Sequence, residues 1–179
     1  MCLLHLISSY SLGRLPQFIF IGAVTSAAYH GSQNLNPFSY GQHGIKSISI
    51  RLDDQIFPQP ACDIDWTNEL GVNTYYQSFL DALNFGSETQ ANNGITRDAW
   101  TNKSKTIFGW NMNSDMAGKD EHASRPYNSR GLLRITIEFT TPPTDALSIL
   151  AWGIFQEEVR SCLIIAFFCF CIILIRFFS

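Results

Sequence analysis

The chain has 179 residues, of which 15% are charged and 13% aromatic, and its formal net charge is −3 at pH 7. This length suits one domain of ordinary size with a core of its own. The aromatic content is typical of a β-rich protein and far from that of disordered chains. No run of Lys or Arg occurs, which argues against a nucleic-acid-binding protein, because phosphate groups need clustered basic side chains.

The cysteines are few and irregularly placed. Cys2 and Cys62 are isolated, and the other three, Cys162, Cys169 and Cys171, lie in an apolar C-terminal segment. An odd count without regular spacing does not predict a disulfide framework, and the last two are too close together for a zinc knuckle. We therefore expect reduced thiols, in a cytosolic or nuclear setting.

Residues 1–11 are expected to form an N-terminal extension, and they lack the basic start of a signal peptide. The first strand is predicted at Phe18–Val24, an apolar run. The second is predicted at Gly44–Leu52, where alternate residues are apolar: Ile48, Ile50 and Leu52. This period of two places the apolar side chains on one face of a sheet and the polar ones on the other.

A short hairpin arm is predicted at Gln55–Phe57, after the turn residues Asp53 and Asp54. Pro58 and Pro60 should end it, because proline lacks the N–H group that a central strand needs.

One segment has a helical period, Thr74–Asn84. Its apolar residues recur at spacings of three and four, at Tyr76, Phe79, Leu80 and Leu83. Thr74 followed by Gln77 matches a capping box, and Gly86 suits the end of a helix. We predict a short surface helix that covers a loop of the sandwich, rather than a partner-binding helix.

The second half of the chain alternates polar loops with strands. Ser87–Thr106 and Asn111–Ser129 are predicted as long surface loops, and Thr106–Trp110 as a short strand between them. The clearest strand is Leu132–Phe139, with alternate residues facing inward, and Ala146–Phe155 is the last strand. Short strands, long loops and one brief helix indicate an all-β antiparallel sandwich.

The C-terminal tail differs from the rest. Cys162–Ile175 is an unbroken apolar run, followed by Arg176 and two phenylalanines. A membrane-spanning helix takes about 20 apolar residues, so the run is of borderline length. Three interpretations stay open for residues 159–179: an apolar, helical membrane anchor, a segment packed against a partner, or an artefact of a wrongly assigned gene end.

Several motifs occur in an order that points to a known family. They are Leu12–Gly22 (LGRLPQFIFIG), Asn36-Pro37-Phe38 with Ser39–His43, Ile48–Pro60 (ISIRLDDQIFPQP), Asn93–Arg97 (NGITR), Gly131–Phe139 (GLLRITIEF) and Ala146–Phe155. Together they resemble the double-jelly-roll major capsid (hexon-like) proteins of polinton- and adintovirus-type elements and their relatives in invertebrate genomes. The resemblance covers about Leu12–Glu158 and only the C-terminal one of the family's two jelly rolls.

The resemblance implies an antiparallel jelly-roll β-sandwich over residues 12–158, with the two long polar loops as contacts in a trimer. The chain departs from the family at Asp53-Asp54, where an Asp-Gly turn is usual, and in its apolar tail. With the upstream jelly roll missing, these departures suggest a truncated, genome-resident copy.

No catalytic, cofactor-binding or metal site is expected. The acids Asp53, Asp54, Asp63 and Asp65 do not follow a calcium-loop pattern and are interpreted as turn and loop residues. The histidines, His5, His30, His43 and His122, are too scattered for metal ligation, and no nucleophile motif accompanies them. The tryptophans, Trp66, Trp100, Trp110 and Trp152, are interpreted as packing residues rather than as a sugar-binding face.

The sequence therefore predicts a non-enzymatic structural protein of capsid type, or a domesticated remnant of one, that forms a homo-oligomer or binds a partner jelly roll. It would lie in a virion, the nucleus or the cytoplasm, with no nucleic acid, cofactor or small-molecule substrate bound. The alternative is a lectin-like binding module held at a membrane through Cys162–Phe178.

Overall fold

The computed structural model describes residues 4–12, 16–52, 55–57, 62–83, 94–112, 131–155 and 170–176. Its strands are β1 (Leu4–Leu12), β2 (Phe18–Thr25), β3 (Ile45–Leu52), β4 (Gln55–Phe57), β5 (Ile107–Asn111), β6 (Gly131–Phe139), β7 (Leu147–Ile154) and β8 (Phe170–Arg176). Its helices are α1 (Ser26–Tyr29), α2 (Val72–Leu83) and α3 (Arg97–Asn102). The described chain is thus mostly β, with short helices.

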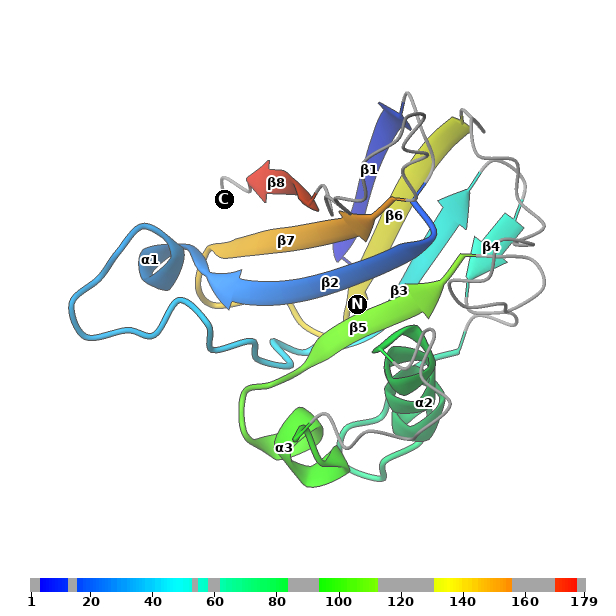
Figure 1. The fold of residues 1–179 in the computed structure, drawn as a ribbon. Helices are drawn as coiled ribbons and strands as arrows, with labels where there is room; N and C mark the ends of the chain where they lie inside the picture. Colours follow the sequence, from blue (N-terminus) through cyan, green and yellow to red (C-terminus); the bar gives the residue numbers. More distant parts are fainter. Residues whose placement is uncertain are drawn as a thin grey trace.

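The strands form two antiparallel sheets that face each other (Figure 1). One sheet has the order β1-β6-β3-β4 and the other the order β5-β2-β7-β8. The connections from β1 to β2 and from β6 to β7 each pass from one sheet to the other. The prediction of a mostly β protein with antiparallel strands in two sheets is therefore confirmed, and the predicted strands correspond to β2 through β7.

Strand β6 shows the predicted alternation most clearly. Leu133, Ile135 and Ile137 are each at most 1% exposed, whereas Arg134 between them is only half-buried. The four inward side chains of this strand, with Phe139 as the fourth, lie in the main core between the sheets.

Strand β3 departs from simple alternation at its start. Ile45 and Ile48 are both buried, although three positions apart they would lie on opposite faces of a regular strand. A β-bulge resolves this, because the pairing with β6 shifts between Ile45 and Ser47. The extra residue returns Ile48 and Ile50 to the core face.

Strands β2 and β7 are buried on both faces, which explains their nearly continuous apolar sequences. Their inner faces contribute residues such as Ile21 and Ile149 to the main core. Their outer faces contribute Val24 and Leu150 to a second, smaller cluster. This second cluster also contains Ala28 of α1, so it fixes that helix to the outside of the sheet.

Helix α2 occupies the predicted place but begins earlier, at Val72, and turns a different face inward. Its buried residues are Val72, Tyr75, Phe79 and Ala82. Of the four apolar residues that indicated the helix, Phe79 is buried, whereas Tyr76, Leu80 and Leu83 are only partly buried at the edge of the core. The helix is therefore part of the core rather than a surface cover.

The prediction of only one helix is wrong. Helix α1 lies within the segment after β2, and α3 lies in a region predicted as loop. Thr96 begins α3 by accepting a hydrogen bond from the Ala99 amide at 3.2 Å, and Asp98 lies in its first turn. Trp100, fully buried, ties this short helix to the core.

The ends of the chain also differ from expectation. Residues 4–11 of the predicted extension belong to β1, which pairs with β6. Within the predicted helical tail, Phe170–Arg176 forms β8, which pairs with β7, so a helix there is wrong. Among the described residues, no helix is long and apolar enough to cross a membrane.

Several predicted features lie outside the described residues. They are the turn Asp53-Asp54, Pro58, Pro60, Gly86, residues 87–93 of the loop Ser87–Thr106, residues 113–129 of the loop Asn111–Ser129, and residues 159–169 and 177–179 of the tail.

Candidate functional site

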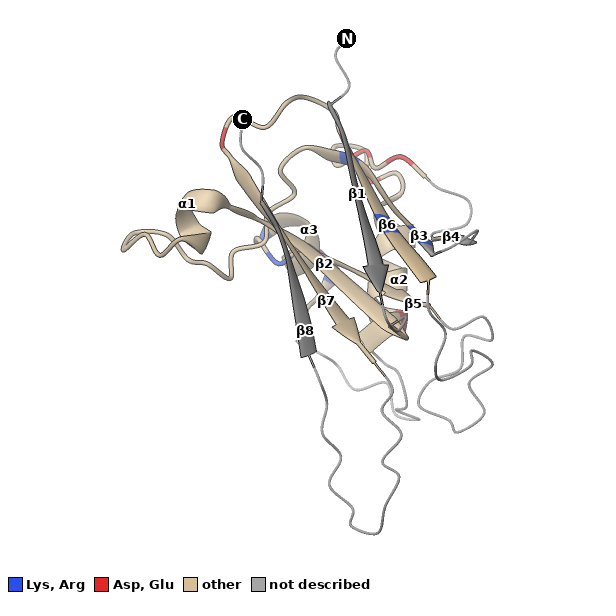
Figure 2. Cartoon of the chain, turned by 90° about the horizontal axis from the view of Figure 1, so that it is seen from above, with Lys and Arg blue, Asp and Glu red and all other residues tan. Residues whose placement is uncertain are grey.

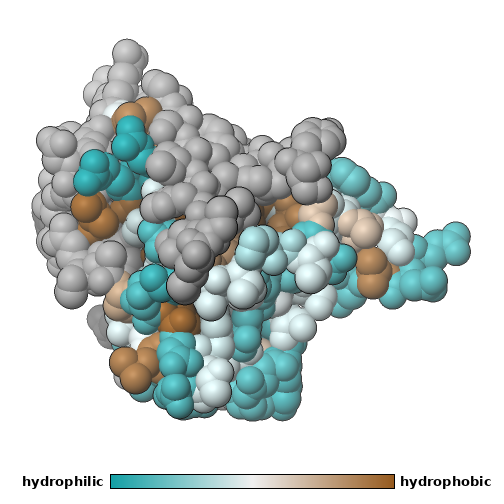
Figure 3. Space-filling view, turned by 180° about the vertical axis from the view of Figure 1, so that it is seen from behind, coloured by the Kyte–Doolittle hydropathy of each residue, from teal (hydrophilic) through white to brown (hydrophobic). Residues whose placement is uncertain are grey.

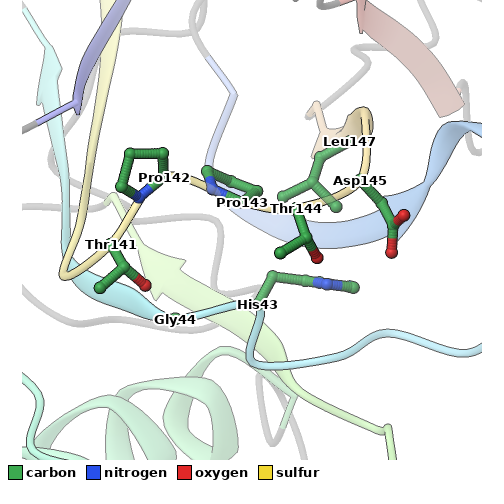
Figure 4. Close-up of a pocket in the computed structure, with 8 residues that line it drawn as sticks. All are labelled: His43, Gly44, Thr141, Pro142, Pro143, Thr144, Asp145 and Leu147. Carbon is green, nitrogen blue, oxygen red and sulfur yellow. The ribbon is translucent and has the colours of Figure 1, made fainter.

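A small pocket lies where the segment leading into β3 meets the connection between β6 and β7. It has a volume of about 200 Å³ and is lined by His43, Gly44, Thr141, Pro142, Pro143, Thr144, Asp145 and Leu147. Figure 4 shows the two proline rings along one side and the imidazole of His43 extending toward the side where Asp145 lies.

Strand pairing brings these distant segments together. Ile45 pairs with Phe139 at the start of β3, and the Thr140 amide donates a hydrogen bond to the Gly44 carbonyl oxygen at 2.9 Å. The pocket therefore forms where the register between β3 and β6 ends and the chain crosses to the other sheet.

A tight turn presents His43 to this pocket. The Ile45 amide donates to the Gln42 carbonyl oxygen at 2.9 Å, and the two central residues have positive φ, 46° at His43 and 69° at Gly44. Positive φ at both central positions is the mark of a type I′ turn. Glycine adopts it freely, but at His43 it stores strain of about 1–3 kcal/mol.

The imidazole of His43 is partly enclosed. Its Nε2 atom is buried without a hydrogen-bond partner among the described residues. Burial lowers the pKa of His43 below its ordinary value, and a hydrogen bond to the Ala23 backbone and the nearby Asp145 carboxylate oppose that shift. The lowered pKa favours a neutral imidazole at pH 7.

Beside the pocket, residues 26–41 form a projection that we call the arm (Figure 1). Its base is fixed by Tyr40, which is 8% exposed and packs edge-on against Trp152 with ring centroids 5.7 Å apart. The Gly41 amide donates to the Ala23 carbonyl oxygen, and the Tyr40 carbonyl oxygen accepts from the Thr106 amide at 3.0 Å. The arm is thus attached to β2 and to Thr106, the residue before β5.

The far part of the arm is a turn with an outward phenylalanine. The Asn36 side chain accepts a hydrogen bond from the Phe38 amide at 2.9 Å, and its carbonyl oxygen accepts from Ser39 at 3.2 Å. Pro37 suits this turn because its φ is preset. Phe38 is 74% exposed and Leu35 45%, and Figure 3 shows apolar groups on the projecting arm among hydrophilic ones.

The arm contains no charged residue. Between Arg14 and Lys46 the sequence has no Asp, Glu, Lys or Arg, and in Figure 2 α1 and the loop after it carry no charged colour. The polar groups on its surface are side-chain amides, hydroxyls and the imidazole of the exposed His30. Depletion of charge is a property of the centre of protein interfaces.

Two of the four acids interpreted as turn and loop residues, Asp63 and Asp65, have partners in the described part of the chain. Asp63 forms an ion pair with Lys46 at 3.0 Å. Asp65 accepts hydrogen bonds from Thr67 and Asn68, which lower its pKa, the Asn68 side chain most strongly. No group of three potential metal ligands occurs in the described part of the chain.

Two of the four histidines, His30 and His43, have side chains that the structure describes. His43 lies at the pocket, His30 is exposed at the end of α1, and the side chains of His5 and His122 are outside the described set.

The tryptophans do not share one exposed face. Trp100 and Trp110 are 0% and 2% exposed, and so are unavailable to a ligand. Trp66 packs against Trp100 and donates to the Ile45 carbonyl oxygen at 2.7 Å, while Trp152 lies under the arm. Packing is therefore the role that their positions show.

Sequence reasoning did not identify the pocket or the exposed Phe38 as a site. The turn at Asn36 carried a signal, because Asn-Pro is typical of turn initiation. No sequence pattern indicated the pocket, since residues 43–44 and residues 141–147 are brought together only by strand pairing.

Fold and site together define a two-sheet antiparallel β protein with an uncharged projecting arm beside a small pocket. No protein-family model matches the sequence, and no solved structure matches it. The chain is similar to the uncharacterized protein F54H12.2 of Caenorhabditis elegans, with 26% identity over 130 residues. The match covers 73% of this chain, and the chain spans about 30% of the length of that relative.

Proposed function

We propose that the chain is a structural subunit, a capsid-type protein or a domesticated remnant of one, whose copies associate with one another. The observation that carries this proposal is the arm: an anchored, uncharged projection with Phe38 74% exposed. An aromatic side chain held outward in uncharged surroundings is typical of the centre of an interface.

The sandwich is compatible with the same role. Two sheets of four strands match the strand number of a jelly roll. β1 pairs with β6, whereas a roll wound from one long hairpin pairs its first strand with its last. The strand number and the two sheets therefore support a capsid-type sandwich, whereas the strand order differs from that of a complete jelly roll. The trimer is proposed from the resemblance of the ordered motifs over Leu12–Glu158 to the capsid family.

Sedimentation velocity of the full chain, from low to high micromolar concentration, tests the proposal. We expect the mass to rise with concentration toward that of a trimer. A chain that stays monomeric at the highest concentration contradicts it.

A further inference from the structure

We infer that Phe38 of one copy inserts into the pocket beside His43 of a second copy, and that this contact joins the subunits. The inference rests on the self-association proposed above and names the surface that produces it.

The structure holds Phe38 outward and away from its own pocket. Two hydrogen bonds to Asn36 fix the turn that carries the ring, from the Phe38 and Ser39 amides. Tyr40, between Phe38 and His43, is buried, and its carbonyl oxygen accepts a hydrogen bond from the amide of Thr106, the residue before β5. The ring therefore cannot fold back without breaking these contacts, and a second copy can use it without any rearrangement.

The pocket has the volume that a phenyl ring needs, and part of its lining is apolar. Its volume is about 200 Å³, and an apolar protein cavity of about 150 Å³ is large enough for benzene. Pro142, Pro143 and Leu147 offer apolar surface, and the His43 imidazole offers a flat ring for stacking.

Charge does not oppose this contact. The arm has no Asp, Glu, Lys or Arg, and Asp145 is the one residue of these four types among those that line the pocket. Asp145 is exposed, so its carboxylate can keep its water when the ring enters. Burial also favours the neutral form of His43, so no unpaired charge is desolvated.

The two surfaces differ, so the contact runs from the arm of one copy to the pocket of the next. Such a heterologous contact forms a ring when the rotation between copies closes, and a filament when it does not. If the ring closes with three copies, the arm-to-pocket contact is the one that holds the proposed trimer together.

Complementary variants of the full chain test the inference. Phe38→Ala removes the ring but leaves the pocket open. Thr144→Trp fills the pocket from an exposed position but leaves the ring. Each variant alone should associate about ten- to a hundred-fold more weakly than the wild type. Mixed together, they should form a one-to-one pair, because one open pocket and one ring remain.

Two control variants accompany them. Leu35→Ala, on the same arm, and Thr74→Trp, at an exposed position of α2, should associate like the wild type. Binding of the peptide Ser32–Tyr40 to the Phe38→Ala chain, and its loss when Thr144→Trp is added, provides a second readout. Circular dichroism checks that every variant is folded.

The outcomes separate the two claims. If the wild type associates and both variants associate equally well, this contact is wrong while self-association stands. If the wild type stays monomeric, the proposed function fails and the contact fails with it. If the mixed variants do not pair although each is folded, the arm-to-pocket contact is also wrong.

Discussion

The hydroxyl oxygen of Tyr75, on α2, lies 3.0 Å from the carbonyl oxygen of Ile48, on β3, and accepts from the Ile48 amide at 3.4 Å. Strand β4 pairs with β3 only from Ile50 to Leu52, so it does not reach Ile48. The phenol therefore takes the place of a neighbouring strand at this edge. Next along the edge, the Ile64 amide donates to the Lys46 carbonyl oxygen at 2.6 Å.

Tyr75→Phe should destabilise the fold by about 1–3 kcal/mol, because it leaves buried backbone groups without a partner. The hydroxyl also lies 2.8 Å from the Cys62 carbonyl oxygen, so two segments lose their link. Urea unfolding measures the loss. Tyr76→Phe is the control: its hydroxyl donates to Ile95 in a partly exposed place, and about 0.5–1.5 kcal/mol is expected. Equal losses in the two variants would contradict the role given to Tyr75.

Gly71→Ala should destabilise the fold by about 3 kcal/mol or more. Gly71 has a φ of +75°, and an added Cβ would collide with the backbone carbonyl of Asp63. Gly31→Ala separates the two causes, because Gly31 has a φ of +94° but no atom within 4 Å of the added Cβ. This control should lose only the conformational part, about 1–2 kcal/mol. Thermal unfolding gives both values, and a larger loss for Gly31→Ala would contradict the steric argument.

The stability of the fold should fall as pH decreases from 7 toward 5. Burial lowers the pKa of His43 in the folded state below its ordinary value of 6.5. In the window just below 6.5 the unfolded chain therefore binds more protons, and stability rises with pH.

His43→Asn should flatten this slope, since asparagine does not titrate and tolerates positive φ. Urea unfolding at several pH values measures it. His30→Asn, which removes an exposed imidazole, is the control. A slope unchanged in His43→Asn would show that His43 does not cause the dependence.

Truncation after Glu158 should promote aggregation. β8 pairs with β7 from Ser148 to Ile154, so its removal exposes the hydrogen-bonding edge of a strand buried on both faces. Light scattering of purified protein measures this. A chain that ends at Arg176 retains β8 and should behave like the full chain. If the chain ending at Glu158 stays clear and monomeric, β8 does not protect this edge.

Much of the sandwich could be predicted from local patterns, because in a strand with one solvent-exposed face apolar and polar residues alternate along the sequence. The alternation at Leu133, Ile135 and Ile137 identified β6 with its inward face. The bulge at the start of β3 could not be seen in this way, since it is defined by the partner strand. The same holds for β2 and β7, whose second buried face depends on α1 and Tyr40.

The helices show where local signals compete with packing. Thr96 and Asp98 gave a start signal for α3, but the surrounding polar residues resemble a loop. In α2 the large side chains of Leu80 and Leu83 suggested the inward face, whereas the core takes Ala82, whose small side chain allows close approach. The pocket is a tertiary feature, because it joins residue 43 to residues 141–147.

The uncharged stretch has a consequence for peptide mapping. Trypsin cuts after Lys and Arg, so digestion releases β2, the arm and the turn at His43 as the single peptide Leu15–Lys46. Cross-linkers that react with lysine amines likewise have no attachment point on the arm. A trypsin-resistant fragment that contains Phe38 therefore says nothing about whether the arm is covered. Chymotrypsin, which cuts after aromatic residues, or a photoactivated carbene label reports on that surface directly.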